Sequence, residues 1–169
     1  MKKIIKAIVF DFDGVVVDSE PLYEATGREL FRHYGIETRD EDWKIFKGLT
    51  AEDFFRTAIK KFNLNLRTED IAKEDQRILK NKFQQKLKYI KGFKPFLKQI
   101  KTQCLHALVT STSRQLLTWI FTHTGITNDF PLIITADDVT RPKPAPEPYL
   151  LVAEKLQICP GEMLVIEDS

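Results

Sequence analysis

Cysteine is scarce in this chain, and neither sign of charge is in large excess. Cys104 and Cys159 lie far apart and lack the C-x-x-C or Cys/His spacing that is typical of a metal or redox site. We therefore expect a reduced, cytoplasmic setting, in which disulfides are rare. The formal net charge is only +2 and the lysines are dispersed along the chain, so we expect no nucleic-acid partner.

Long apolar runs are also missing. The N-terminal segment 1–6 is basic and then apolar, but its apolar run breaks at Lys6 and soon meets Asp11. It is too short and too charged for a signal peptide or a membrane span, so we expect no membrane partner. Apolar residues make up 43% of the chain and charged residues 30%, which is ordinary for a globular protein with its own core.

The most informative stretch is a short apolar run, residues 8–10, that leads into Asp11, Phe12, Asp13 and Gly14. Ligands of an α/β sheet collect at the carboxyl ends of its strands. Side chains alternate along a strand, so the two aspartates should point to the same side and share one substrate. One carboxylate can stay ionised while the other carries a proton, if a cation or the surroundings separate their pKa values. By itself the pattern is as often a simple turn.

Elements of two kinds follow. We expect Val15–Val17 to continue extended, then only helices, at residues 20–35, 50–62 and 68–89, with Asp18 or Ser19 capping the first. From residue 92 onward, helices alternate with apolar strands at 105–110, 132–135 and 163–166. This alternation predicts a doubly wound α/β fold with a mostly parallel sheet. The predicted core covers residues 1–15 and 92–169, and an all-helical domain, residues 16–91, is inserted in it.

Polar groups occur at three further strand or loop ends. Thr110 and Ser111 precede a helix and could hold an anion, although the hydroxyl run there is more often a helix cap. Lys143 lies between two prolines, where restricted backbone could aim it at a phosphate; the alternative is a solvated loop lysine. Glu167 and Asp168 end the last strand, and alone they would be solvated. Together with Asp11 and Asp13, these groups form the set expected for phosphoryl transfer with Mg²⁺.

The same residues carry a family resemblance. In chain order, the segments 11–14, 18–20, 110–111, 143–147 and 166–169 resemble the signature of the haloacid dehalogenase superfamily, and they are most similar to its β-phosphoglucomutase-like phosphatases. The resemblance implies a Rossmann-like core and a helical cap that closes over the site. Its hinges would lie near residues 15–19 and 90–92.

The resemblance also implies a role for each residue. Asp11 would attack phosphorus and become an aspartyl-phosphate, and Asp13 would protonate the leaving oxygen and later activate water. Mg²⁺ would be held by Asp11, the backbone carbonyl of Asp13, and Asp168, with assistance from Glu167. The phosphoryl oxygens would be gripped by Ser111, Thr110 and Lys143. In the cap, Tyr23 and Lys47 are candidate substrate contacts, although a surface role for Lys47 is at least as common.

Two departures from the mutase pattern bear on the substrate. Tyr23 stands where the mutase has a histidine, and Ala51 stands where it has an arginine that holds a second phosphate. These departures favour hydrolysis of a small phosphorylated metabolite, such as a sugar monophosphate, over a sugar phosphomutase. A non-catalytic binding or vestigial domain is the alternative from another class. Dehalogenation would need neither the metal acids nor Lys143, and no G-x-G-x-x-G follows the first strand, which disfavours a dinucleotide enzyme.

The relatives continue beyond the position of Ser169 with a further strand and helix. Without that part of the core, apolar surface and unpaired backbone should be exposed at one edge of the sheet. We expect a monomer that is less stable than a longer relative, with reduced activity or with association through this edge.

Overall fold

A computed structural model describes residues 4–46 and 49–168 and divides the chain into two compact units. The α/β unit comprises residues 1–20 and 87–169, and the helical unit comprises residues 21–86. The predicted domain boundaries at 15/16 and 91/92 differ from these by a few residues and stay a prediction. No helix among the described residues is long and apolar enough to cross a membrane, and neither cysteine is in a disulfide.

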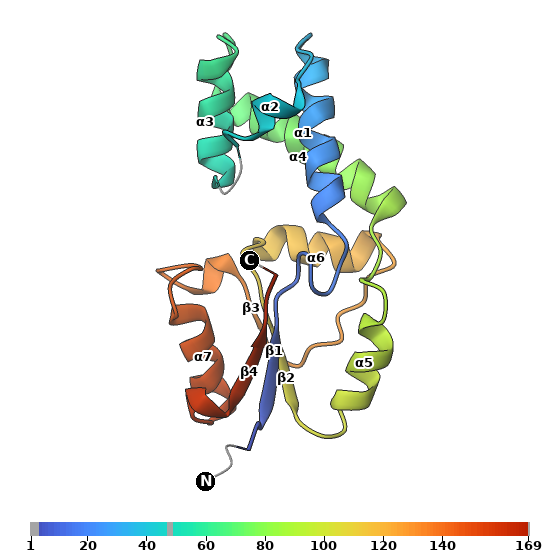
Figure 1. The fold of residues 1–169 in the computed structure, drawn as a ribbon, viewed down its shortest axis with the longest axis vertical. Coiled ribbons are helices and arrows are strands. Elements are labelled where there is room, and N and C mark those ends of the chain that lie inside the picture. The colour runs from blue at the N-terminus through green and yellow to red at the C-terminus, as the bar shows by residue number, and fades with distance from the viewer. Residues whose placement is uncertain (1–3, 47–48, 169) are drawn as a thin grey trace. The chain divides into compact units, whose positions relative to one another are not determined.

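The α/β unit is built on a four-stranded sheet in the order β3-β2-β1-β4, with every pairing parallel (Figure 1). The strands are β1 (Ala7–Phe10), β2 (Leu105–Val109), β3 (Ile133–Ile134) and β4 (Met163–Ile166). Phe10 is in register with Leu108 of β2 and with Ile166 of β4. The carboxyl end of β1 therefore lies between those of its two neighbours, and the predicted α/β fold with a parallel sheet is confirmed.

Helices cover both faces of this sheet. Helix α7 (Glu147–Leu156) packs on one face over a buried cluster that includes Val9 of β1 and Val152 of the helix. Helices α5 (Phe93–Ile100) and α6 (Arg114–His123) lie across the sheet from α7 (Figure 1). There Phe10 meets the ring of Phe93 edge-on, with 5.6 Å between ring centroids. The alternation of Val9 and Phe10 thus fixes β1 between two apolar layers.

The expectation that residues 15–17 continue extended is wrong. The backbone N–H groups of Val16 and Val17 both donate to the carbonyl of Phe12, at 2.9 and 3.0 Å, and Gly14 N–H donates to Val17 O at 2.9 Å. Gly14 has φ +72°, a left-handed conformation that β-branched residues rarely adopt but glycine adopts freely. This glycine starts a tight turn that overrides the strand propensity of the valines.

The third predicted helix also ends earlier than expected. Helix α4 (Thr68–Lys86) stops before Tyr89 because the next residues pair with the first connecting segment. Asp18 N–H donates to Lys88 O, and Val17 and Tyr89 form an antiparallel bridge. The two chain segments that join the units are therefore bonded to each other.

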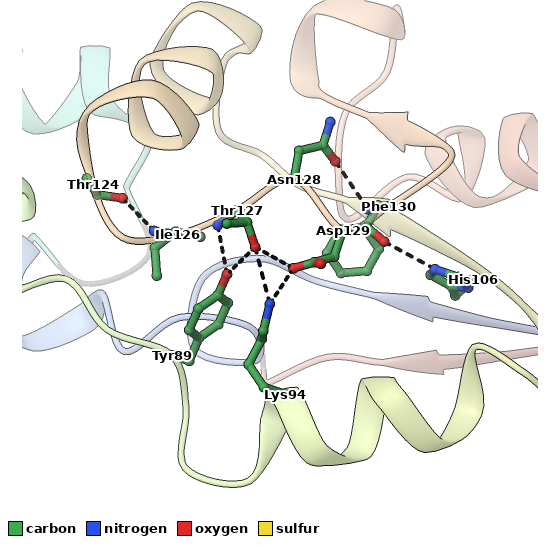
Figure 2. Close-up of polar contacts among 9 residues, drawn as sticks. All are labelled: Tyr89, Lys94, His106, Thr124, Ile126, Thr127, Asn128, Asp129 and Phe130. Carbon is green, nitrogen blue, oxygen red and sulfur yellow. Dashed lines mark hydrogen bonds and ion pairs between the residues drawn. The ribbon is translucent and has the colours of Figure 1, made fainter.

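The second connecting segment is further fixed to the α/β unit by the side chain of Tyr89 (Figure 2). Its hydroxyl accepts a hydrogen bond from Thr127 N–H at 2.7 Å and lies 3.0 Å from Thr127 Oγ1. Lys94 Nζ bonds Asp129 at 2.7 Å and lies 4.9 Å from the centroid of the Tyr89 ring. These contacts anchor the segment up to Tyr89, so it is a tethered part of the core rather than a free linker.

The helical unit has an aromatic core. It contains α1 (Glu20–His33), which begins at the unit boundary, α2 (Asp40–Trp43), α3 (Ala51–Lys61) and α4. Phe31, fully buried, lies 5.6 Å from Trp43 and 5.0 Å from Phe62 between ring centroids. A Cβ at Gly27 would lie 2.6 Å from the Trp43 ring, so this position leaves room for the indole. The short helix α2, which the sequence does not predict, carries that indole into the core.

Candidate active site

The two aspartates lie just beyond the end of β1. Strand pairing continues for one more residue, because Asp11 N–H donates to Ile166 O at 2.9 Å. Gly14 then approaches the end of β4 so closely that a Cβ there would lie 2.0 Å from Oδ2 of Asp168. The turn that follows β1 therefore forms a cradle for the Asp168 carboxylate, and only glycine leaves space for it.

Lys143 joins two of the predicted site carboxylates. Its Nζ lies 2.8 Å from Asp11 Oδ1 and 2.7 Å from Glu167 Oε1. The Lys143 side chain is only 13% exposed and that of Asp11 only 10%, so both charges are shielded from bulk water. The solvated-loop alternative for this lysine does not describe the structure, in which the ammonium group lies among carboxylates. The Lys143–Pro144 peptide is cis.

Tyr149 is a member of this cluster that the sequence reasoning missed. Its hydroxyl donates to Glu167 Oε1 at 2.7 Å, the same oxygen that Lys143 contacts. The other carboxylate oxygen, Oε2, is buried and has no hydrogen-bond partner among the described residues. Burial and the bond to Glu167 raise the pKa of Tyr149, so the phenol stays a donor. Its position six residues after Lys143, in the first turn of the helix, was the available signal.

The carboxylates fit a divalent cation. One oxygen each of Asp11, Glu167 and Asp168 can be chosen so that all lie within 4.8 Å of one another. All are hard oxygen donors, the kind that Mg²⁺ prefers. Lys143 pairs with two of these three carboxylates, and Glu167 Oε2 lacks a partner among the described residues, so the set has both the charge and the free oxygen that a cation would satisfy. The side chain of Asp13 is not part of this set.

The electrostatics of the pair Asp11 and Glu167 point the same way. Burial raises the pKa of Asp11 to about 7, the neighbouring Glu167 carboxylate adds to the shift, and Lys143 and the Phe12 N–H oppose it. Burial also acts to raise the pKa of Glu167, but its interactions with the Asp11 carboxyl, Lys143 and Tyr149 outweigh burial, and the net direction is downward. The two carboxylates thus respond to their shared surroundings in opposite directions. An ionised Asp11 depends on a cation beside it.

Asp13 is held by hydroxyl groups from two different loops. Ser19 Oγ donates to its Oδ1 at 2.6 Å, and Thr112 Oγ1 donates to its Oδ2 at 2.8 Å. Ser19 is fully buried and Thr112 nearly so. The sequence analysis placed both residues in possible helix caps, and Ser19 also in the family signature, but gave neither a role at Asp13. Their hydroxyls fix the orientation of the carboxylate, which is what a proton-transferring group needs.

The hydroxyl run at 110–113 divides its roles between residues. Ser113 is the N-cap of α6 and accepts a bond from Leu116 N–H at 3.3 Å. Thr110 is buried, and its hydroxyl accepts from Thr112 N–H at 3.0 Å. Ser111 is exposed, and its hydroxyl has no hydrogen bond among the described residues. The cap interpretation thus holds for Ser113, and a phosphate-binding role for Thr110 and Ser111 stays a prediction.

Two candidate substrate contacts, Tyr23 and Lys47, were predicted in the helical unit. Tyr23 lies on α1, is 38% exposed, and packs edge-on against Phe83 with 5.4 Å between ring centroids. Lys47 lies outside the described residues. A substrate role for either residue stays a prediction.

Comparisons with known proteins identify the family to which the chain belongs. Residues 8–169 match the family described as haloacid dehalogenase-like hydrolase. The chain is 28% identical over 166 residues to a phosphorylated carbohydrates phosphatase of Thermotoga maritima, covering 98% of this chain and 77% of that protein. It is 33% identical over 174 residues to a provisionally named phosphatase, YhcW, of Bacillus subtilis, covering 98% and 76%.

A solved structure shows the same fold over nearly the whole chain. It is a Thermotoga maritima protein provisionally described as a β-phosphoglucomutase, and it superposes with a TM-score of 0.85 at 28% identity. The match covers 98% of this chain and 77% of that one. The similarity therefore extends through both compact units and all four strands.

Proposed function

Since this chain belongs to the haloacid dehalogenase-like hydrolases, we propose that it is a Mg²⁺-dependent phosphatase that acts through an aspartyl-phosphate. The observation that carries the proposal is the buried contact of Lys143 with both Asp11 and Glu167 beside the orphaned oxygen of Glu167. A nucleophile, a cation-binding set and a phosphate-neutralising group thus meet at the ends of β1 and β4. Its relatives include phosphatases of phosphorylated small molecules.

Each residue has a step that its position allows. Asp11 attacks phosphorus, forming a carboxylate–phosphorus bond while the bond from phosphorus to the ester oxygen breaks. Asp13, protonated, gives its proton to that leaving oxygen; it then takes a proton from water, which attacks the aspartyl-phosphate and releases phosphate. The hydroxyls of Ser19 and Thr112 keep Asp13 aimed during both steps.

Charge neutralisation is the main demand of this reaction, because an anionic nucleophile must approach an anionic ester. Lys143 is placed to meet phosphoryl oxygens while it contacts Asp11. Asp11, Asp168 and the Asp13 carbonyl, with Glu167, would hold Mg²⁺, which would supply Lewis-acid stabilisation of the charge that develops on those oxygens. Ser111, with its exposed hydroxyl, is the proposed neutral donor, and such preorganised groups usually contribute the largest catalytic effect.

A small sugar monophosphate is the substrate we favour. The similarity to a phosphorylated carbohydrates phosphatase supports this class, and Ala51, exposed at the start of α3, supplies no cationic side chain for a second phosphate. A phosphomutase would convert one sugar phosphate into its isomer and would need a bisphosphate primer. A non-catalytic domain would bind without turnover.

Phosphate release from p-nitrophenyl phosphate and from a panel of sugar monophosphates, with Mg²⁺ or with EDTA, tests the proposal. We expect Mg²⁺-dependent release, which Asp11→Asn lowers by about 10³-fold or more because the nucleophile is lost. Asp129→Asn, whose carboxylate pairs with Lys94 away from the cluster, is the matched control. Unchanged hydrolysis by Asp11→Asn would refute the mechanism. With a sugar bisphosphate primer added, an isomeric sugar phosphate without phosphate release would indicate the mutase, and no turnover with or without the primer would indicate the non-catalytic domain.

A further inference from the structure

The Glu167 carboxylate is held asymmetrically. Its Oε1 accepts two hydrogen bonds of 2.7 Å, one from Lys143 and one from Tyr149, whereas its buried Oε2 accepts none from the described residues. Two charge-assisted or phenolic donors occupy the lone pairs of Oε1. The oxygen left for a metal ion or a metal-bound water is therefore Oε2.

The two donors to Oε1 differ in whether they also contact other groups. Lys143 also contacts Asp11 at 2.8 Å, and in the proposed reaction it must share its charge with the phosphoryl group. Among the residues that the structure describes, the Tyr149 hydroxyl makes one hydrogen bond, to Glu167. When Lys143 interacts with the phosphoryl group of the substrate, Tyr149 still donates its hydrogen bond to the Glu167 carboxylate.

Tyr149 is also built to hold a fixed position. It lies in the first turn of α7, where its N–H donates to Pro146 O at 3.1 Å. Its ring packs against the buried cluster that contains Val9, Ala107 and Val152. A phenol with only two rotatable bonds and a packed ring loses little entropy in keeping its hydroxyl in place.

We propose that Tyr149 is a positioning residue, which holds Oε1 of Glu167 so that Oε2 stays turned toward the cation. The inference rests on the proposed function, since it assigns a further residue to the same site. In this proposal Tyr149 contacts neither the substrate nor the metal. Its effect passes through the orientation of Glu167, and partners of that kind typically tune metal affinity.

Titration of Mg²⁺ into the metal-free 169-residue protein by isothermal calorimetry tests this role. Tyr149→Phe removes only the hydroxyl, and we expect the dissociation constant for Mg²⁺ to rise about tenfold, as is typical for loss of an outer-shell hydrogen bond. Tyr34→Phe is the control, because the Tyr34 hydroxyl makes no hydrogen bond among the described residues, and it should bind Mg²⁺ as the parent does. Equal affinities for Tyr149→Phe and the parent would overturn the inference.

A double-substitution cycle separates positioning from a general loss of structure. In a Glu167→Gln background, Tyr149→Phe should weaken Mg²⁺ binding no further, because the group through which it acts has changed. An additive loss, or a fall in thermal stability of metal-free Tyr149→Phe that accounts for the weaker binding, would overturn the assignment.

Activity supplies an independent readout. With Tyr149→Phe, the Mg²⁺ concentration for half-maximal phosphate release should rise, while the rate at saturating Mg²⁺ stays within about twofold of the parent because no transition-state contact is lost. If no phosphate ester is hydrolysed but Tyr149→Phe still weakens Mg²⁺ binding, the proposed function fails and the positioning role stands. If esters are hydrolysed and Mg²⁺ affinity is unchanged, the reverse holds.

Discussion

The two compact units bury charge in opposite ways. In the α/β unit, Asp11 and Lys143 are buried together with Glu167, and each has a partner of the opposite sign or a hydrogen-bond donor. In the helical unit, Asp75 lies on the apolar face of α4, between Ile71 and Ile78, and burial alone raises its pKa to about 6. No hydrogen bond or ion pair to the Asp75 side chain occurs among the described residues.

The carboxylates near Lys143 are buried where the proposed chemistry needs them, whereas burial of the Asp75 carboxylate only lowers the stability of the folded state. Clustered carboxylates repel one another, and the cost is offset when a lysine and a cation join them. A single carboxylate without a partner gains nothing in return for its lost hydration. The comparison therefore predicts that changes at the cluster affect activity most, and that neutralising Asp75 improves stability.

Gly14→Ala should have the largest effect, because it strikes the cluster at its closest approach. The new methyl group would overlap Asp168 Oδ2, so the carboxylate must leave its cradle. We expect activity to fall by about 100-fold or more, as for loss of a metal-orienting group. Gly35→Ala is the matched control, since Gly35 has φ +74° but nothing within 4 Å of its Cβ position. Similar activity losses in both variants would show that backbone strain, not Asp168, is responsible.

Thr112→Val should have a smaller effect, because it removes one of the two hydroxyl groups that orient Asp13. It removes the hydroxyl that donates to Asp13 Oδ2 and leaves the Ser19 bond in place. We expect kcat to fall about tenfold with little change in KM, because a less well oriented Asp13 transfers its proton less effectively. Steady-state kinetics with Thr122→Val, which loses an exposed hydroxyl bond within α6, supply the reference. A change in KM alone would contradict a role through Asp13.

Asp75→Asn should have the smallest effect and the opposite sign. The pKa of Asp75 in the folded state, about 6, lies above its ordinary value of 3.8. Between these values the unfolded chain loses its proton first, so the parent becomes less stable as the pH rises from about 4 to 6. The variant should lose this decline and be more stable at pH 7 by on the order of 1 kcal/mol.

Urea unfolding at several pH values measures this effect. The chain has two tryptophans, Trp43 in the helical unit and Trp119 in α6, so a Trp119→Phe background makes fluorescence report on the helical unit. Asp70→Asn, on the same helix but paired with Arg67 at the surface, is the control and should not gain stability at pH 7. The test is the difference between the two proteins, because carboxylates such as Asp70 have lowered pKa values and contribute the opposite pH dependence. The same change in stability between pH 4 and 6 in the parent and in Asp75→Asn would contradict the raised pKa of Asp75.

Features set by residues close together in the sequence could be predicted, whereas contacts between residues far apart in the sequence could not. The parallel sheet followed from apolar runs that alternate with helical periods, and the Lys143 loop was recognised from its two flanking prolines. Tyr149 and Glu167 are 18 residues apart and Thr112 and Asp13 are 99 apart, so no local pattern links them. The turn at 14–17 was missed because valine favours strands, whereas the conformation of Gly14 decided the path.

In the described part of the chain, strand β4 pairs with β1 alone and lies at the edge of the sheet, and its Leu164 and Val165 are 47% and 39% exposed. Glu167 and Asp168 follow this strand, while Asp11 follows its neighbour. A binding site that uses all three carboxylates exists only when β4 is paired with β1. Ligand binding and the pairing of these two strands are therefore linked equilibria. A free ligand concentration of about 100 times the dissociation constant would stabilise the paired strands by about 2.7 kcal/mol. Fraying of β4 would release the ligand by the same thermodynamic coupling.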